Sequence, residues 1–123
     1  MGLRVLIVDD SSVMRKILER SLRQASKSAI DEVIEAGDGG EAMEKLAGAS
    51  VSVIFSDINM PHVNGLEFLR LLKESPHKDL PVIMVTTEGG ERAVMEAISL
   101  GAKGFIRKPF TAAQMVDALA KVT

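Results

Sequence analysis

The sequence predicts an α/β fold, a doubly wound parallel sheet with helices on both faces. Short apolar runs alternate regularly with segments of helical periodicity along the 123 residues. Several of the runs are continuously apolar, which is typical of strands that are buried on both faces. Alternation of strand and helix favours a parallel sheet, because a crossover helix must join each pair of parallel strands. The length suits one compact domain with one modest core.

The predicted strands are short apolar runs that end at residues unfavourable to strands. The first run stops at Asp9, the second stops at the glycine-rich turn 37–40, and the fourth begins after Pro81. Glycine, proline and aspartate commonly mark turns, so they set the limits of the runs. The strands are predicted over residues 4–8, 32–36, 51–55, 82–85 and 104–107.

The predicted helices lie between these strands, where apolar residues recur three and four positions apart. Ser11, Ser12 and Thr111 are of types that cap helix N-termini, and Gly48 and Gly101 can end helices. The helices are predicted over residues 12–25, 41–47, 65–72 and 91–100, and from Thr111 to Val122. The apolar face of the first helix is expected to consist of Val13, Met14, Ile17, Leu18, Leu22 and Ala25.

Five strands that alternate with five helices in a chain of this length favour the flavodoxin-like strand order 2-1-3-4-5. Right-handed crossovers then distribute the five helices over both faces of the sheet. The sequence contains no low-complexity segment or linker, so residues 1–123 are expected to form a single domain without an output domain.

Composition excludes several classes of protein. The chain has 46% hydrophobic and 26% charged residues and a net charge of -2, unlike a disordered segment or a basic DNA-binding domain. It has no cysteine, which excludes disulfides and thiol catalysis. The apolar N-terminus stops at Asp9 and is too short for a signal peptide or a membrane span. We therefore expect a cytoplasmic protein that binds neither nucleic acid nor membrane.

Polar and charged residues stand at the ends of four of the five predicted strands. Asp9 and Asp10 follow the first strand, Asp57 the third, Thr86 the fourth and Lys108 the fifth. In an open parallel sheet the carboxyl ends of the strands meet at one edge, and ligands bind where the strand order reverses. Strand ends are often polar simply because they meet solvent, and this explains one or two such residues. It explains less well why three carboxylates and a lysine converge on one crevice.

Three ionised carboxylates need a compensating cation. Mg²⁺ prefers a few oxygen ligands together with water and phosphate oxygens, so it suits this edge. A carboxylate can act as the nucleophile in phosphoryl transfer, which depends mainly on positioning and charge neutralisation. The residues therefore predict Asp57 as a phosphoryl acceptor beside Mg²⁺, with Lys108 supplying charge and Thr86 a hydrogen bond.

With these residues in place, the whole chain resembles the receiver domain of two-component response regulators. The segment Ser11-Ser12-Val13-Met14-Arg15-Lys16, and the absence of an output domain, make it most similar to stand-alone chemotaxis regulators of the CheY type. The matching segments are Val8-Asp9-Asp10-Ser11, Asp57-Ile58-Asn59-Met60-Pro61, Asn64-Gly65, Val85-Thr86 and Lys108-Pro109-Phe110.

The resemblance implies a role for each matching position. Asp57 would accept the phosphoryl group, and Lys108 would pair with it. The Mg²⁺ ligands would be Asp9, Asp10, Asp57 and the Asn59 backbone carbonyl.

The resemblance also implies a conformational switch. Thr86 would move to bond the phosphoryl group, Phe105 would turn inward behind it, and the Lys108–Pro109 peptide would be cis. Asn59 and Glu88 would tune dephosphorylation, and their types favour a short-lived phosphoryl group, which a half-life of many hours for phosphorylated Asp57 would contradict.

The implied partners are a CheA-like sensor histidine kinase, a downstream target such as a flagellar motor protein, and a phosphatase. The output surface would lie on the fourth helix, fifth strand and fifth helix, roughly residues 90–120, and the protein is expected to be a monomer. The basic run Arg15, Lys16, Arg20 and Arg23 is expected to be a solvated helix face, with docking of a kinase domain as the alternative.

Other functions stay open at this point. A phosphorelay intermediate or another stand-alone receiver outside chemotaxis would share the same residues. Gly37, Gly39 and Ala42 formally fit a dinucleotide-binding fingerprint, with Asp57 about 20 residues further on, so a small nucleotide- or flavin-binding domain is the remote alternative. An aspartyl phosphatase would want an acid where Asn59 stands.

Overall fold

The computed structural model describes residues 2–27, 29–87 and 90–122 and contains one sheet of five parallel strands. The sheet has the order β2-β1-β3-β4-β5, as predicted. The strands are β1 (Leu3–Val8), β2 (Ile30–Ala36), β3 (Val53–Ser56), β4 (Val82–Thr86) and β5 (Gly104–Arg107).

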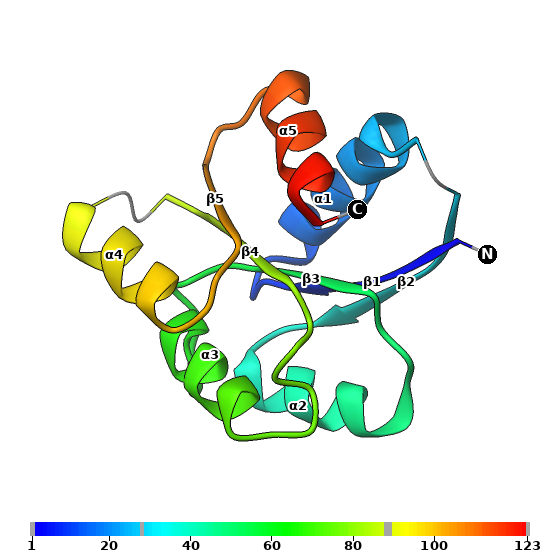
Figure 1. Ribbon diagram of the computed structural model, residues 1–123. Helices are drawn as coiled ribbons and strands as arrows, with labels where there is room; N and C mark the ends of the chain where they lie inside the picture. The colour runs from blue at the N-terminus through cyan, green and yellow to red at the C-terminus, as the bar shows by residue number, and fades with distance from the viewer. Residues whose placement is uncertain (1, 28, 88–89, 123) are drawn as a thin grey trace.

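In the described parts of the chain, five helices cover the two faces of the sheet, again as predicted (Figure 1). α1 and α5 lie on one face, and α2, α3 and α4 lie on the other. The helices are α1 (Ser12–Ala25), α2 (Gly39–Gly48), α3 (Gly65–Lys73), α4 (Glu91–Ser99) and α5 (Ala112–Val122). Within the described part of the chain, none of them is long and apolar enough to cross a membrane.

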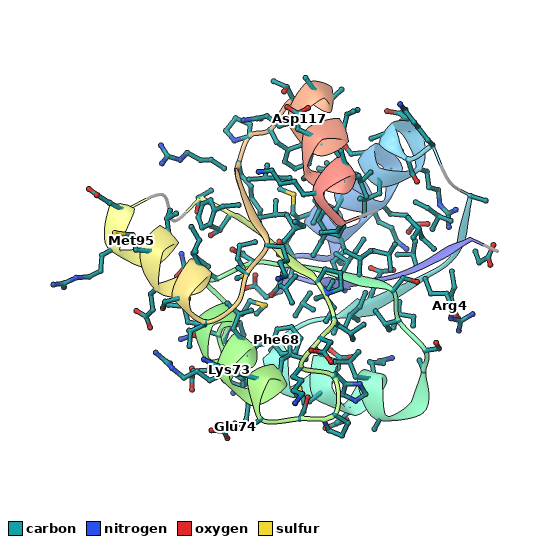
Figure 2. The ribbon with its side chains drawn as sticks, in the orientation of Figure 1. Arg4, Phe68, Lys73, Glu74, Met95 and Asp117 are labelled. Atoms are coloured by element: carbon teal, nitrogen blue, oxygen red, sulfur yellow. The ribbon has the colours of Figure 1, made fainter. Side chains whose placement is uncertain are left out.

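Each face of the sheet has its own apolar core, because residues along each strand alternate between the two faces. On the α1 and α5 side, Phe55 and Met115 are fully buried. On the other side, Phe68 from α3 is fully buried against the sheet (Figure 2). The central strands β3 and β4 are buried throughout, as their continuous apolar runs predict.

The register of the central strands brings their carboxyl ends to one edge. Val8 of β1 is paired with Ser56 of β3, and Ser56 is paired with Met84 of β4. Asp9 and Asp57 therefore follow directly from paired residues on neighbouring strands. The strand order reverses at this point. β2, the next strand in the chain after β1, lies on one side of β1, and β3 lies on its other side.

Some predicted boundaries and faces differ from the structure. β3 covers Val53–Ser56 rather than 51–55, and α2 begins at Gly39, two residues early, because the Asp38 side chain accepts a hydrogen bond from the Glu41 N–H and caps the helix. The predicted apolar face of α1 is partly wrong: Val13 is 68% exposed and Ile17 is 45% exposed. The buried line of α1 instead runs through Leu18 and Leu22.

The loop after β3 is held close to the helix that follows it. Asn64 and Glu67 form a reciprocal capping box at the start of α3. The Gly65 N–H donates a 2.8 Å hydrogen bond to the Ile58 carbonyl. A Cβ on Gly65 would lie 2.1 Å from the Asp57 carbonyl oxygen, so only glycine permits this close approach. The start of α3 thus fixes the backbone that carries Asp57.

Candidate functional site

Asp9 is fixed by hydrogen bonds at every polar group. Its N–H donates to the Ala36 carbonyl at 3.0 Å, which extends the pairing of β1 with β2. Its Oδ1 accepts from the Ser11 N–H at 2.9 Å, and its Oδ2 accepts from Lys108 Nζ at 2.7 Å. Its carbonyl accepts from Arg15 Nη1 at 2.7 Å. The carboxylate is therefore buried but fully paired, as a buried charge must be.

The Asp57 carboxylate uses its two oxygens differently. Oδ1 accepts a 2.7 Å hydrogen bond from the Ile58 N–H and a longer one, 3.4 Å, from the Asn59 N–H. Among the described residues, Oδ2 has only the Lys108 ammonium within reach, at 3.4 Å. The Asp57 N–H continues the sheet by donating to the Val8 carbonyl at 2.9 Å. The backbone thus holds one oxygen, while the other stays weakly bonded at the edge of the sheet.

Lys108 joins Asp9 and Asp57 across the switch point of the sheet. Its ammonium lies 2.7 Å from Asp9 Oδ2 and 3.4 Å from Asp57 Oδ2, and its side chain is 11% exposed. Its backbone N–H donates to the Thr86 carbonyl at 2.9 Å, and the Lys108–Pro109 peptide is cis. Lys108, which follows the edge strand β5, thus places its positive charge at the carboxyl ends of β1 and β3.

Asp9, Asp10 and Asp57 form an acidic cluster. Each offers a carboxylate oxygen, and these oxygens lie within 4.8 Å of one another. With Lys108 the cluster carries a formal charge of 1 − 3 = −2. Hard carboxylate oxygens at this spacing, one of them on the exposed Asp10, fit a divalent cation that prefers oxygen and retains water. The donor set therefore suits Mg²⁺ in both charge and chemistry.

The other predicted site residues lie around this cluster. Thr86 is fully buried at the carboxyl end of β4. Phe105 is half-buried on β5, paired in register with Met84, and packs against the core on the α3 and α4 side. Asn59 is exposed and touches Asp57 Oδ1 only through its backbone N–H. Glu88 lies outside the described residues.

Support for the cluster also comes from residues that the sequence did not single out as functional. Arg15 was expected to belong to a solvated helix face, but this is wrong: its side chain is 19% exposed and bonded on two sides. Nε donates to Glu35 Oε1 at 2.8 Å, and Nη1 donates to the Asp9 carbonyl. The available signal was its spacing from Leu18 and Leu22, which places Arg15 on the inward line of α1.

Hydrogen bonds to the Lys16 ammonium and the Arg15 guanidinium hold the pKa of the Glu35 carboxyl below its ordinary value. A lowered pKa in the folded state stabilises the fold above the unfolded-state pKa of about 4.3, and this contribution is lost as the pH falls through the lower folded-state pKa. We therefore expect Glu35→Gln to lower the free energy of unfolding at neutral pH and to have a diminishing effect as the pH falls below about 4.3.

Urea unfolding of the wild type and of Glu35→Gln across this pH range measures the difference. Glu44→Gln is the matched control, because Glu44 is exposed and forms no hydrogen bond or ion pair with another described residue. A Glu35→Gln difference that stays constant from neutral to strongly acid pH would contradict the assignment of Glu35 as an ionised anchor.

The glycine-rich turn after β2 does not form a dinucleotide site. The Gly39 N–H donates to the Val63 carbonyl at 2.9 Å, and the Gly37 N–H donates to Glu41 Oε1 at 2.6 Å. The amide groups of both fingerprint glycines are thus bonded within the protein and are not turned toward a pyrophosphate. β2 is moreover an edge strand, away from the β1 and β3 switch point.

Comparison with known proteins agrees with this geometry. The response regulator receiver domain family matches residues 5–120. The chain is 43% identical over 111 residues to the chemotaxis protein CheY1 of Helicobacter pylori, covering 89% of this chain and 87% of that protein. It is 42% identical over 111 residues to a chemotaxis protein CheY homolog of Campylobacter jejuni, covering 89% and 83%. The solved structure of chemotaxis protein CheY4 of Vibrio cholerae matches with a TM-score of 0.86 and 35% identity, covering 100% of both chains.

Proposed function

The chain belongs to the response regulator receiver domain family, and we propose that it accepts a phosphoryl group on Asp57 from a histidine kinase. The observation that carries this proposal is the convergence of Asp57 with Asp9, Asp10 and Lys108 at the switch point of the sheet. Receiver domains of the CheY type are signalling proteins rather than classical enzymes, so the phosphorylated form is the signal and not a step in a turnover reaction.

In the proposed reaction, Asp57 Oδ2 forms the new bond to phosphorus. The phosphorus–nitrogen bond of the donor phosphohistidine breaks, and the leaving imidazole nitrogen keeps the electron pair and takes up a proton. Backbone hydrogen bonds to Oδ1 hold the carboxylate in place. Asp9, Asp10, Asp57 and the Asn59 carbonyl would hold Mg²⁺, which when bound supplies positive charge opposite the phosphoryl oxygens.

The chain's own residues then respond to the new charge. Lys108 exchanges its contact with Asp57 for the phosphoryl oxygens, and the Thr86 hydroxyl donates to them. The response biases an existing equilibrium, because a ligand can only favour a conformation that it binds better. The domain thus assists its own phosphorylation, and by the same groups its dephosphorylation, whose rate Asn59 and Glu88 tune.

The proposed output surface comprises α4, β5 and α5. It carries exposed apolar side chains, Met95 and Ile98 on α4 and Val116 on α5, and Met95 is labelled on α4 in Figure 2. The relatives named as chemotaxis proteins support a role in motility signalling, with a CheA-like kinase upstream, a flagellar motor protein downstream, and a phosphatase. We propose a single receiver domain that acts in trans as a cytoplasmic monomer.

Incubation with a small phosphodonor and Mg²⁺, followed by intact-mass measurement, tests the function. We expect the wild type to gain the mass of one phosphoryl group and Asp57→Asn to gain none. Asp117→Asn is the matched control, because Asp117 is exposed on α5 (Figure 2), does not belong to the acidic cluster, and should be phosphorylated like the wild type. A gain that persists in Asp57→Asn, or no gain together with NAD or FMN binding by the wild type, would overturn the proposal.

A further inference from the structure

Arg15 connects the end of β2 with the end of β1. Its Nε donates to Glu35 Oε1 at 2.8 Å, and its Nη1 donates to the Asp9 carbonyl at 2.7 Å. Glu35 is the penultimate residue of β2, and its second oxygen accepts from Lys16 Nζ at 2.8 Å. The planar guanidinium is therefore held at two points, a geometry that a single ammonium cannot reproduce.

The carbonyl that Arg15 contacts belongs to the peptide between Asp9 and Asp10. The Asp9 carboxylate has its own anchors, the Ser11 N–H and Lys108 Nζ. Asp10 is exposed, and its carboxylate accepts no hydrogen bond from another described residue. The backbone on either side of Asp10 therefore places its carboxylate in the cluster, and Arg15 holds the Asp9–Asp10 peptide while the Ser11 N–H bond holds the other side.

From the Glu35–Arg15–Asp9 juxtaposition, we infer that Arg15 is a positioning residue that holds the Asp9–Asp10 peptide and so presents the Asp10 carboxylate to Mg²⁺. The inference rests on the proposed function, because it gives Asp10 a role as a metal ligand. Glu35 does not contact the Asp9–Asp10 peptide itself but holds the Arg15 guanidinium that does. Partners that orient metal ligands in this way typically change metal affinity about 10- to 100-fold when they are removed.

Charge and positioning make opposite predictions for this residue. Arg15→Met removes a positive charge near a cation site, and the loss of this like-charge repulsion alone would tighten Mg²⁺ binding. Loss of a positioning contact would weaken it. We expect weaker binding, by about 10-fold, because the Asp10 carboxylate then samples orientations outside the cluster.

Titration calorimetry with MgCl₂, at a temperature where each variant is fully folded, measures the affinity. Arg15→Lys keeps the charge without the two-point geometry, so it should also bind more weakly than the wild type. Arg20→Met is the matched control: Arg20 is exposed on the same helix, makes no hydrogen bond to another described residue, and its loss changes the net charge equally. We expect Arg20→Met to bind Mg²⁺ like the wild type.

A second readout needs no metal. In NMR spectra of the metal-free protein, the amide resonance of Asp10 should move or broaden in Arg15→Met and stay in place in Arg20→Met. The double variant of Arg15→Met with Glu35→Gln should bind Mg²⁺ no more weakly than Arg15→Met alone, because both residues act through one contact.

The outcomes separate the inference from the function. Wild-type affinity or tighter binding in Arg15→Met overturns the inference and leaves the phosphorylation proposal standing, as does full restoration of binding by Arg15→Lys. A wild-type protein that does not bind Mg²⁺ overturns both. Weaker binding in both Arg15 variants, with normal binding in Arg20→Met, is the result that the geometry predicts.

Discussion

Replacement of Gly65 by alanine should destabilise the protein by about 3 kcal/mol or more, and should impair phosphorylation as well. A Cβ at this position would lie 2.1 Å from the Asp57 carbonyl oxygen and 2.7 Å from the Ile58 Cα. Both atoms belong to the backbone, so rotation of a side chain cannot relieve the clash. The loop that carries Asp57 must move, or α3 must move away from it.

Urea unfolding and the intact-mass phosphorylation assay measure the two effects of Gly65→Ala. Gly48→Ala is the matched control, because a Cβ on Gly48, the last residue of α2, would have no atom within 4 Å. Alanine there should be neutral or stabilising by about 0.5–1 kcal/mol, since glycine is the poorer helix former. Wild-type stability in Gly65→Ala would show that the loop after β3 is more adaptable than its contacts indicate.

The contrast between these two glycines shows where sequence reasoning reaches its limit. Both stand at predicted helix ends, and local pattern cannot tell them apart. What distinguishes Gly65 is the approach of the Asp57 backbone, a contact between segments joined through a loop of irregular structure. Such a contact depends on the path of that loop, which no periodicity encodes.

The fold was predictable for the opposite reason. The buried central strands appear as continuous apolar runs, and their alternation with helices leaves few allowed topologies once crossovers are right-handed. The strand-end residues were predictable too, because parallel strands bring Asp9, Asp57 and Lys108 to one edge. The buried face in the first turns of a helix was less predictable from the sequence. In α1, Val13 is apolar yet exposed, whereas Arg15 is charged yet mostly buried.

Replacement of Lys108 by methionine should have the other large effect on stability, and the size of this effect should depend on Mg²⁺. Without the metal, the Lys108 ammonium offsets the charge of the Asp9 carboxylate, whose side chain is 2% exposed, at 2.7 Å. Removal of one partner of a buried ion pair costs about 3–5 kcal/mol, because the other charge remains buried and uncompensated. We expect Lys108→Met to be destabilised by about this amount in the presence of a chelator.

Mg²⁺ should then bind more tightly to Lys108→Met than to the wild type. In the wild type the ammonium already meets part of the charge of Asp9 and Asp57, and it repels an incoming cation. Without it, the affinity should rise by about tenfold or more. A tenfold gain in affinity would close the stability gap by about 1.4 kcal/mol at saturating Mg²⁺, since ligand binding stabilises the folded state by mass action.

Urea unfolding of Lys108→Met with a chelator and with saturating Mg²⁺, together with calorimetry, tests both effects. Lys103→Met is the matched control: Lys103 precedes β5, is exposed, and its ammonium forms no ion pair with another described residue, so its loss should change neither quantity. Weaker Mg²⁺ binding in Lys108→Met would mean that the ammonium organises the carboxylates rather than compensating their charge. Tighter binding would mean that the Lys108 ammonium and Mg²⁺ compete for the same carboxylates. Phosphorylation of Asp57 would then supply the additional negative charge that allows the ammonium and Mg²⁺ to remain in the site together.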